Sequence, residues 1–312
     1  MRSFNVNDIR AVLAGSYELS GNLSLMFDGF KPIAEASINS VTWIRPGINN
    51  AGDLINNNNA GCVICDKETF DLYSGDTNDI LFITSDNPHI LFVKLLSHFH
   101  SEPKIAETTI HPTVILHPDC EIGEGVSIGA YSIVGACKIG DYTVIHENVK
   151  IFDEVNIGAD CIIREFCSIG GEGFGIVKDE EGNNMHVPHI GNVIIGNNVI
   201  ILPYSNVDRG TLGSTIIEDF TAIDHYCHIG HNSVVGRNSI ITAGVVLAGG
   251  AKVGQNCYLG VQTIIKQKVV LGDSVTTGMG SVVTKNIPTG QTWMGNPAME
   301  RSIFLKARGA NE

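Results

Sequence analysis

An aliphatic residue recurs at every sixth position over most of residues 110–283, and this period constrains the fold more than any other feature. The longest run steps by six through Ile217, Ile223, Ile229, Val235, Ile241, Leu247, Val253, Leu259, Ile265, Leu271, Thr277 and Val283. Its only non-aliphatic member is Thr277. Two further blocks keep the period, with one residue lost after Val134: Ile110, Leu116, Ile122, Ile128 and Val134, then Ile139, Ile145, Ile151, Ile157, Ile163 and Ile169, and finally Ile195, Ile201 and Val207.

A period of six fits neither an α-helix, at about 3.6 residues per turn, nor a single alternating strand. It fits a short strand followed by a tight turn, with one inward side chain on each face of a three-sided coil. Coils stacked at the usual strand spacing of about 4.8 Å predict a prism of roughly nine coils and 40 Å. A β-sandwich is disfavoured, because its turns recur at about 8 to 12 residues and vary in length.

Glycine directly follows many of the inward positions, for example at Gly230, Gly236 and Gly254. We expect these glycines to supply turn conformations with positive φ, which cost glycine little. The Asn and Asp residues of GNN, GDY, GRN and GQN are expected to serve the same turns.

The charge balance disfavours some partners. The formal net charge is −13, from 33 acidic and 20 basic residues, without the Lys and Arg clusters that nucleic acids or anionic membranes require. The first residues lack the apolar core of a secretory signal, and no apolar run approaches the roughly 20 residues that span a bilayer. We therefore expect a cytoplasmic protein with no nucleic-acid partner and no membrane insertion.

The eight cysteines are scattered through aliphatic stretches, as is typical of small buried side chains in a reducing compartment. Cys62 and Cys65 form a CxxC in AGCVICD, but no second CxxC and no His ligand lie nearby. Core packing is the favoured interpretation, and zinc or redox chemistry is the alternative.

The hexad suggests three parts. Residues 1–106 lack it and mix alternating apolar runs with a helix-like stretch starting at Asn87 or Pro88, which predicts an N-terminal α/β domain. Residues 107–289 form the β-helix, interrupted by a polar excursion between Ile176 and His189 whose GNN predicts a projecting hairpin. Residues 290–312 form a short tail that covers the open end of the prism.

The segment IDHYCHIGHN concentrates candidate catalytic side chains within the regular repeat. His225 and His231 each come two places after an inward isoleucine, so both are expected near turns on the outside. A neutral imidazole suits removal of a proton from an amine that attacks a thioester. Asp224 is either a turn former or a carboxylate that orients an imidazole.

The segments ILPYSNVDRGTLGSTIIEDFTAIDHYCHIGHN and GGEGFG resemble the UDP-3-O-(3-hydroxyacyl)glucosamine N-acyltransferases of the lipid A pathway, which are bacterial hexapeptide-repeat acyltransferases. The likeness covers almost the whole chain and is strongest from about residue 165 to about residue 260. It implies a left-handed parallel β-helix, against the usual crossover hand, and a homotrimer. It also implies transfer of an acyl group from acyl-CoA or acyl carrier protein to the amino group of a nucleotide-linked amino sugar, with no permanently bound cofactor and no metal.

The resemblance also assigns residues. His231 matches the general base, Gly249 matches the N–H donor to the oxyanion, and Trp43 matches an aromatic residue that holds uracil. The alternatives are structural packing of His231 at a subunit interface, a plain turn role for Gly249 and core packing of Trp43. The candidate acceptor pocket, in which Arg209 suits a phosphate or forms a structural ion pair, consists of Phe174, Gly175, Asp208, Arg209, His225 and Asn232. His228 is expected to line the site or cap a turn.

The chain departs from that family in ways that bear on the substrate. Lys268 replaces a second functional His, Pro46 replaces a frequent Asn, and the C-terminus ends near GNPA without a long helical extension. Lys268 remains a candidate for donor binding. An acidic acyl carrier protein needs a basic docking patch on a chain of net charge −13, so acyl-CoA is the easier donor.

The predicted function is therefore N-acylation of a nucleotide-linked amino sugar. The alternatives are the lipid A enzyme itself, a zinc-dependent β-helix carbonic anhydrase built on the three His of IDHYCHIGHN, and a non-catalytic sugar-binding scaffold. A nucleotidyltransferase is disfavoured, because residues 1–106 contain no Gly-rich phosphate loop with a following basic motif.

Overall fold

The computed structural model describes residues 3–100 and 107–307, and the chain divides into two compact units, Met1–Pro103 and Lys104–Glu312. None of the described helices combines the length and apolarity that a bilayer crossing requires.

The N-terminal unit is an α/β domain built on a five-stranded sheet with the order β2-β7-β6-β5-β4. Strands β4 to β7 pair in parallel, and β2 adds an antiparallel edge. Its elements are β1 (Phe4–Asn5), α1 (Val6–Val12), β2 (Glu18–Gly21), β3 (Met26–Phe27), β4 (Gly29–Phe30), a 3-10 turn (Ile33–Glu35), β5 (Ser40–Trp43), α2 (Ala51–Asn56), β6 (Cys62–Cys65), α3 (Lys67–Phe70), a second 3-10 turn (Thr77–Asp79), β7 (Leu81–Thr84) and α4 (Pro88–His100).

The predicted helix of this unit is α4, and Asn87 caps its start by accepting a hydrogen bond from the Ile90 N–H at 3.2 Å. The central strand β6 is buried along its whole length, with Cys62 and Cys65 both fully inaccessible. Burial raises the pKa of the Cys65 thiol to about 12, so the CxxC is core and carries no redox-active thiolate.

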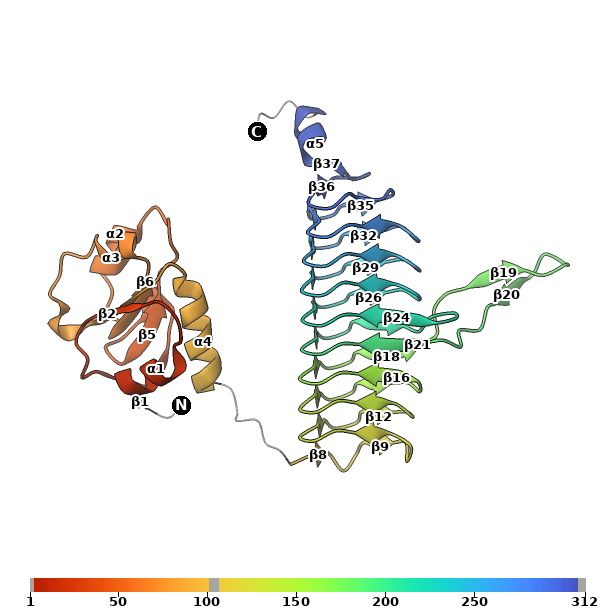
Figure 1. Cartoon of the computed structure of the whole chain (residues 1–312), viewed down its shortest axis with the longest axis horizontal. Coiled ribbons are helices and arrows are strands. Elements are labelled where there is room, and N and C mark those ends of the chain that lie inside the picture. Colours follow the sequence, from red (N-terminus) through yellow and green to blue (C-terminus); the bar gives the residue numbers. More distant parts are fainter. Residues whose placement is uncertain (1–2, 101–106, 308–312) are drawn as a thin grey trace. The chain divides into compact units, whose positions relative to one another are not determined.

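The second unit is a parallel β-helix whose short strands form three sheets, seen as stacked rungs in Figure 1. The eleven-stranded sheet contains β8 (Thr109–Ile110), β11 (Ser127–Ile128), β14 (Val144–Ile145), β17 (Ile162–Ile163), β22 (Ile200–Ile201), β25 (Ala222–Ile223), β28 (Ile240–Ile241), β31 (Tyr258–Leu259), β34 (Thr276–Thr277), β36 (Thr292–Met294) and β37 (Met299–Glu300). The nine-stranded sheet contains β9 (Ile115–Leu116), β12 (Ile133–Val134), β15 (Lys150–Ile151), β18 (Ser168–Gly171), β23 (Asn206–Asp208), β26 (His228–Ile229), β29 (Val246–Leu247), β32 (Ile264–Ile265) and β35 (Val282–Val283). The eight-stranded sheet contains β10 (Glu121–Ile122), β13 (Lys138–Ile139), β16 (Val155–Ile157), β21 (Asn192–Ile195), β24 (Ser214–Ile217), β27 (Val234–Val235), β30 (Lys252–Val253) and β33 (Val270–Leu271).

The predicted inward register is confirmed. Every member of the run from Ile217 to Val283 is buried, and the exceptional Thr277 hydroxyl bonds the Thr263 hydroxyl at 2.9 Å and the Gly260 N–H at 3.1 Å. Ile110 and Leu116, at 40% and 36% exposed, and the partly buried Ile122 are the departures, because no described coil precedes theirs to cover them. The aliphatic column makes one continuous core along the prism.

The predicted role of the repeat glycines is wrong. Apart from Gly170, at φ 90°, the glycines that directly follow inward residues do not have positive φ; a Cβ on Gly236 would lie 2.5 Å from the Gly254 carbonyl carbon of the next coil. They are glycines because successive coils approach closely there. The positive-φ turns fall two residues later and accept non-glycine side chains, including Asn238 at 56°, Tyr226 at 59° and Lys268 at 60°.

Two insertions leave the regular coil on the same edge of the prism. The first follows β18 and contains the antiparallel hairpin β19 (Ile176–Lys178) and β20 (Asn184–His186), as predicted, which projects from the stack in Figure 1. The second is the loop 209–213 after β23. At the other end of the unit, β36, β37 and α5 (Arg301–Ala307) follow the last coil.

Candidate active site

The candidate residues gather at the edge where the chain leaves the nine-stranded sheet for the eight-stranded sheet. The turn after β26 holds His231, the turn after β29 holds Gly249 and the turn after β32 holds Lys268. Asp208 ends β23 of the same sheet. The parallel register, in which His228 pairs with Val246, stacks these turns on successive coils.

His231 is half-buried, and its neighbours fix which ring nitrogen carries hydrogen. The Asn232 side-chain amide is oriented by two bonds: its Nδ2 donates to the Leu212 carbonyl at 2.7 Å, and its Oδ1 accepts from the Thr211 N–H at 3.0 Å. Oδ1 can only accept, so His231 Nδ1, at 3.1 Å, donates to it. Nε2 therefore keeps its lone pair, which is the tautomer that a general base needs.

Gly249 lies directly against that lone pair. A Cβ at Gly249 would come 2.3 Å from His231 Nε2, so no larger residue fits while the imidazole keeps its place. Among the hydrogen bonds of the described residues, none uses the Gly249 N–H as donor. One coil further on, the Lys268 N–H donates to the Gly249 carbonyl at 3.1 Å, and the Lys268 side chain is exposed beside Gly250.

A second imidazole, His228, is oriented by Asn206 and Asp208. The Asn206 Nδ2 donates to Asp208 Oδ1 at 2.6 Å and lies 3.2 Å from His228 Nδ1, while His228 Nε2 lies 3.6 Å from Asp208 Oδ2. Asp208 is only 5% exposed, and burial raises the pKa of its carboxyl above the usual value, against the opposing effects of the Asn206 bond and the nearby imidazoles.

Asp224 and His225 lie elsewhere. They follow β25 of the eleven-stranded sheet, at a different edge of the prism from His231. Asp224 Oδ1 accepts hydrogen bonds from the His225 backbone N–H and from His225 Nδ1, both at 2.7 Å. Asp224 therefore orients an imidazole, as one sequence interpretation had it, but that imidazole is His225. Within one chain the three histidines of IDHYCHIGHN do not converge.

The residues predicted to bind the acceptor lie in different surroundings. Gly175 lies near His189, and Phe174 projects into solvent at 84% exposed. The Arg209 guanidinium donates through Nε to the Gly170 carbonyl and through Nη2 to the Asp153 carbonyl, each at 2.7 Å. Arg209 thus holds the first insertion against the coil below, rather than forming the structural ion pair of the alternative interpretation.

Three site residues were missed by reading the sequence: Thr211, Gly173 and His189. The Thr211 hydroxyl lies 3.2 Å from His231 Nδ1, and the buried His189 ring meets the His231 ring edge to face at 4.9 Å. A Cβ on Gly173 would touch both imidazoles. Strands of one sheet recur every 18 residues outside the insertions, so counting hexads in threes assigns the turns after Ile169, Val207, Ile229 and Leu247 to one edge.

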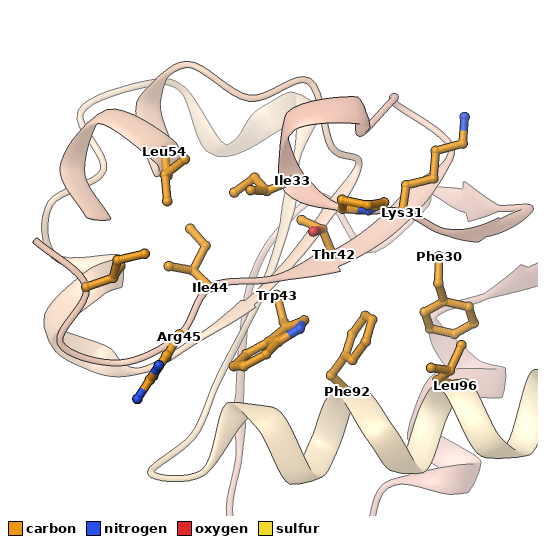
Figure 2. Close-up of a pocket in the computed structure, with 12 residues that line it drawn as sticks. Phe30, Lys31, Ile33, Thr42, Trp43, Ile44, Arg45, Leu54, Phe92 and Leu96 are labelled. Atoms are coloured by element: carbon orange, nitrogen blue, oxygen red, sulfur yellow. The ribbon is translucent and has the colours of Figure 1, made fainter. Parts of the chain in front are cut away.

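Trp43 lines a separate pocket of about 530 Å³ in the N-terminal unit. Figure 2 shows its ring between β5 and α4, next to Phe92, with Arg45 at one end of the pocket. The Trp43 ring also stacks on the His89 ring at 4.5 Å. The pocket walls are mostly apolar, with Ile33, Ile44, Leu54 and Phe30 among them. A flat apolar ring bound beside an indole fits such a cavity.

The described residues contain one group with the spacing of a metal site, His146, Glu147 and Glu165. It lies on turns of the eleven-stranded sheet, away from His231, and the Arg164 guanidinium already occupies the Glu165 carboxylate at 2.9 Å. Burial is the main cause that lowers the pKa of His146. The geometry of one chain therefore gives the zinc hydratase interpretation no support.

Comparison with known proteins agrees with the repeat and the fold. The family profile described as bacterial transferase hexapeptide (six repeats) matches residues 214–249, the segment that carries His231 and Gly249. Residues 214–249 therefore match the hexapeptide-repeat family. The repeat unit of the chain resembles solved UDP-N-acetylglucosamine acyltransferases: that of Moraxella catarrhalis is 27% identical with a TM-score of 0.57, covering 65% of this chain and 79% of that one. The enzyme of Campylobacter jejuni is 25% identical with a TM-score of 0.55, covering 64% and 78%.

These likenesses confirm the predicted left-handed parallel β-helix. The curated relatives carry a different enzyme name from the solved structures. The UDP-3-O-acylglucosamine N-acyltransferase of Bordetella pertussis is 26% identical over 238 residues, 69% of this chain and 66% of that protein. The first such enzyme of Francisella tularensis subsp. holarctica is 31% identical over 190 residues, 54% of each chain. The hexapeptide-repeat chain thus spans about half to two thirds of the length of these relatives, and the predicted resemblance is confirmed.

Proposed function

We propose that this hexapeptide-repeat chain is an N-acyltransferase that moves an acyl group from a thioester to the amino group of a nucleotide-linked amino sugar. One observation carries the proposal. The Nε2 lone pair of His231 lies beside Gly249 and meets no hydrogen-bond donor among the described residues, on the edge of the prism from which the two insertions leave. The names of the curated relatives support the same reaction class.

In the proposed reaction the neutral amine attacks the thioester carbonyl while His231 Nε2 takes an amine proton. Thr211 and Asn232 hold the Nδ1 side and stabilise the imidazolium that results. The carbon–sulfur bond then breaks, the amide bond remains, and the proton passes to the leaving thiolate. The products are an N-acylated sugar and a free thiol, so the step is redox-neutral and needs no oxidant or reductant.

Gly249 serves this reaction in two ways. Its missing side chain leaves room for Nε2, and its unused N–H is the proposed donor to the oxyanion that develops on the carbonyl. The exposed Lys268 side chain, one coil further on, is proposed to contact the phosphates of the donor, either coenzyme A or the phosphopantetheine of an acyl carrier protein.

The relatives favour one acceptor among the possible amino sugars, namely UDP-3-O-acylglucosamine. The lipid A enzyme was the alternative to the broader class of amino-sugar N-acyltransferases in the sequence analysis. The comparisons support this alternative better than the broader class. We propose that the Trp43 pocket binds the nucleobase, because it offers an indole face and apolar walls at about 530 Å³. Asp208, His228 and Gly175 are proposed to contact the sugar, with Phe174 available to cover it.

We further propose a homotrimer. Exposed apolar side chains line the prism, including Ile240 and Tyr258 on the eleven-stranded sheet and Ile264 on the nine-stranded sheet. The Asp224–His225 pair lies on its own edge at 39% and 46% side-chain exposure, available to a neighbouring copy. Light scattering is expected to give three times the mass of the 33.5 kDa chain; a monomer would contradict the proposal.

The proposed function is tested by offering UDP-3-O-acylglucosamine and nucleotide-linked 3-amino- and 4-aminodideoxy sugars to the protein with acyl-CoA or acyl carrier protein donors. Product masses are the readout, and one pair is expected to give an N-acylated sugar and a free thiol. His231→Ala is expected to fold and assemble as the wild type does while kcat falls by about 10² or more, the scale of a lost general base. Full activity in that variant would remove His231 from the mechanism.

A further inference from the structure

The buried imidazole of His189 is not used by the proposed mechanism, although it adjoins the general base. It is 2% exposed, and its Nδ1 lies 2.8 Å from the Val187 carbonyl. A carbonyl only accepts, so Nδ1 carries the hydrogen and Nε2 of the neutral ring keeps a lone pair. Within the described part of the chain, Nε2 is one of two buried side-chain N or O atoms without a hydrogen-bond partner.

Buried polar atoms are nearly always paired, so an unpartnered one calls for an explanation. Structural packing does not supply it, because an apolar side chain of similar size would fill the same space without an unsatisfied acceptor. The Nδ1 bond to the Val187 carbonyl is local and needs no second nitrogen. Nε2 has a use only if a donor reaches it in some state of the protein.

The surroundings indicate where such a donor comes from. Gly173 separates Nε2 from His231: a Cβ there would lie 3.1 Å from His189 Nε2 and 3.0 Å from the His231 Cβ. Gly173 therefore lies against both imidazoles, and Gly175 lies against the His189 ring. The two ring centroids are 4.9 Å apart, which is on the scale of two substituents of one sugar ring.

We propose that His189 Nε2 accepts a hydrogen bond from a hydroxyl of the acceptor sugar, and that residues 172–175 shift to admit it. This inference rests on the proposed function and adds a residue that selects the acceptor and holds its amino group against His231. The donor thioester makes no contact with His189, so His189 affects acceptor binding and not donor binding. Glycines at 173 and 175 suit this cover, because a side chain at either would press on the His189 ring.

Two amide substitutions separate the proposed role from a structural one. His189→Asn keeps a donor near the position of Nδ1, so the bond to the Val187 carbonyl survives, but it removes the acceptor at the position of Nε2. His189→Gln places an acceptor oxygen near the position of Nε2 and is the matched control. Both are made in the full chain and assayed for acceptor KM, thioester KM and thermal unfolding midpoint, with whichever acceptor and donor pair the wild type uses.

His189→Asn is expected to raise the acceptor KM about tenfold or more, the effect of one lost hydrogen bond. His189→Gln is expected to stay within about threefold of the wild type, and the thioester KM within about twofold in both variants. Calorimetric titration of the acceptor, without donor, is expected to repeat the order wild type, Gln, Asn. Should the Asn variant fail to fold, Gly175→Ala places a methyl group 3.1 Å from His189 Cε1, the atom next to Nε2, with no His231 atom among its nearest contacts. The same rise in acceptor KM is then expected.

The two proposals fail in different ways. Wild-type acyl transfer together with an unchanged acceptor KM in His189→Asn, or in Gly175→Ala where the Asn variant does not fold, would overturn the role of His189 alone. Equal losses in the Asn and Gln variants, with lowered unfolding midpoints, would assign His189 to structure and also overturn it. A wild-type protein that neither binds nor acylates any of the amino-sugar nucleotides would remove both proposals.

Discussion

Replacing Gly249 by alanine tests the geometry of the proposed base directly. The new Cβ would lie 2.3 Å from His231 Nε2, 2.7 Å from Cε1 and 2.8 Å from Cδ2, where ordinary contact begins at 3.4 Å. The imidazole must therefore move by about 1 Å, away from the position set by Thr211 and Asn232. A displacement of that size costs about 10²-fold in rate, or about 2.7 kcal/mol of transition-state stabilisation.

The coil itself tolerates the substitution, because Gly249 lies outside the left-handed region, unlike its neighbour Gly250 at φ 72°. The equivalent place, two residues after an inward aliphatic residue, holds side chains elsewhere in the repeat: Arg237, Ala243, Gln255, Val261 and Gln267. The alanine N–H also remains, so the proposed oxyanion donor is kept. A loss of activity would then report the displaced imidazole.

The assay is steady-state acylation with thermal unfolding and light scattering alongside. Gly249→Ala is expected to lower kcat/KM about 10²-fold at an unchanged unfolding midpoint and particle mass. The matched control is Arg237→Ala, which puts alanine at the equivalent place on another edge and loses only an exposed ion pair of 3.8 Å, so full activity is expected. A Gly249→Ala enzyme within about threefold of the wild type would refute the view that the position of Nε2 decides the rate.

Three further predictions concern other parts of the molecule. Trp43→Ala is expected to raise the KM for the nucleotide sugar several-fold more than it lowers kcat, because the nucleobase proposed to occupy this pocket is a part of the substrate that does not react; steady-state kinetics with an unchanged KM would contradict this. Burial raises the thiol pKa of Cys167 and of Cys227 to about 11, so iodoacetamide at about pH 8 is expected to leave both unmodified in the folded protein, and mass spectrometry that finds them alkylated before unfolding would disagree. Burial raises the pKa of Asp208, so the contribution of its carboxyl to folding stability is fully present below the ordinary carboxyl pKa and is lost as pH rises through the folded-state pKa. Asp208→Asn is therefore expected to raise the unfolding midpoint near pH 7 and not near pH 4, and differential scanning fluorimetry at both pH values checks this.

The hexad predicted the inward face of nearly every coil, because burial of one aliphatic side chain per strand is a local and repeated requirement. The cysteines follow the same logic at a second position of the repeat. Six of them come two residues before an inward aliphatic residue, where a small side chain fits inside the turn: Cys120, Cys137, Cys161, Cys167, Cys227 and Cys257. A rule of this kind is visible in the sequence as soon as the period is known.

The glycines were assigned the wrong physical cause, since the sequence shows which residues are small but not which clash they avoid. Gly236 is small because the next coil passes at close range, whereas the strained turn falls at Asn238. The tautomer of His231 could not be predicted from the sequence either. It depends on Thr211, which lies beside the imidazole, and on the Leu212 carbonyl, which orients the Asn232 amide. Both belong to the insertion after β23, one coil away from His231.

The site also explains why a regular prism alone is not a catalyst. Coils that stack at a constant spacing present ridges of turns without a concave surface, and every turn of one edge is nearly equivalent to the next. Here two insertions leave the same edge one coil apart, and between them they supply Thr211 on one side of His231 and His189 on the other. The regular coils contribute what insertions cannot, a rigid floor in which Gly249 is held against Nε2. Acceptor specificity should therefore follow changes in residues 170–191 and 209–213, and the position of the base should follow the repeat.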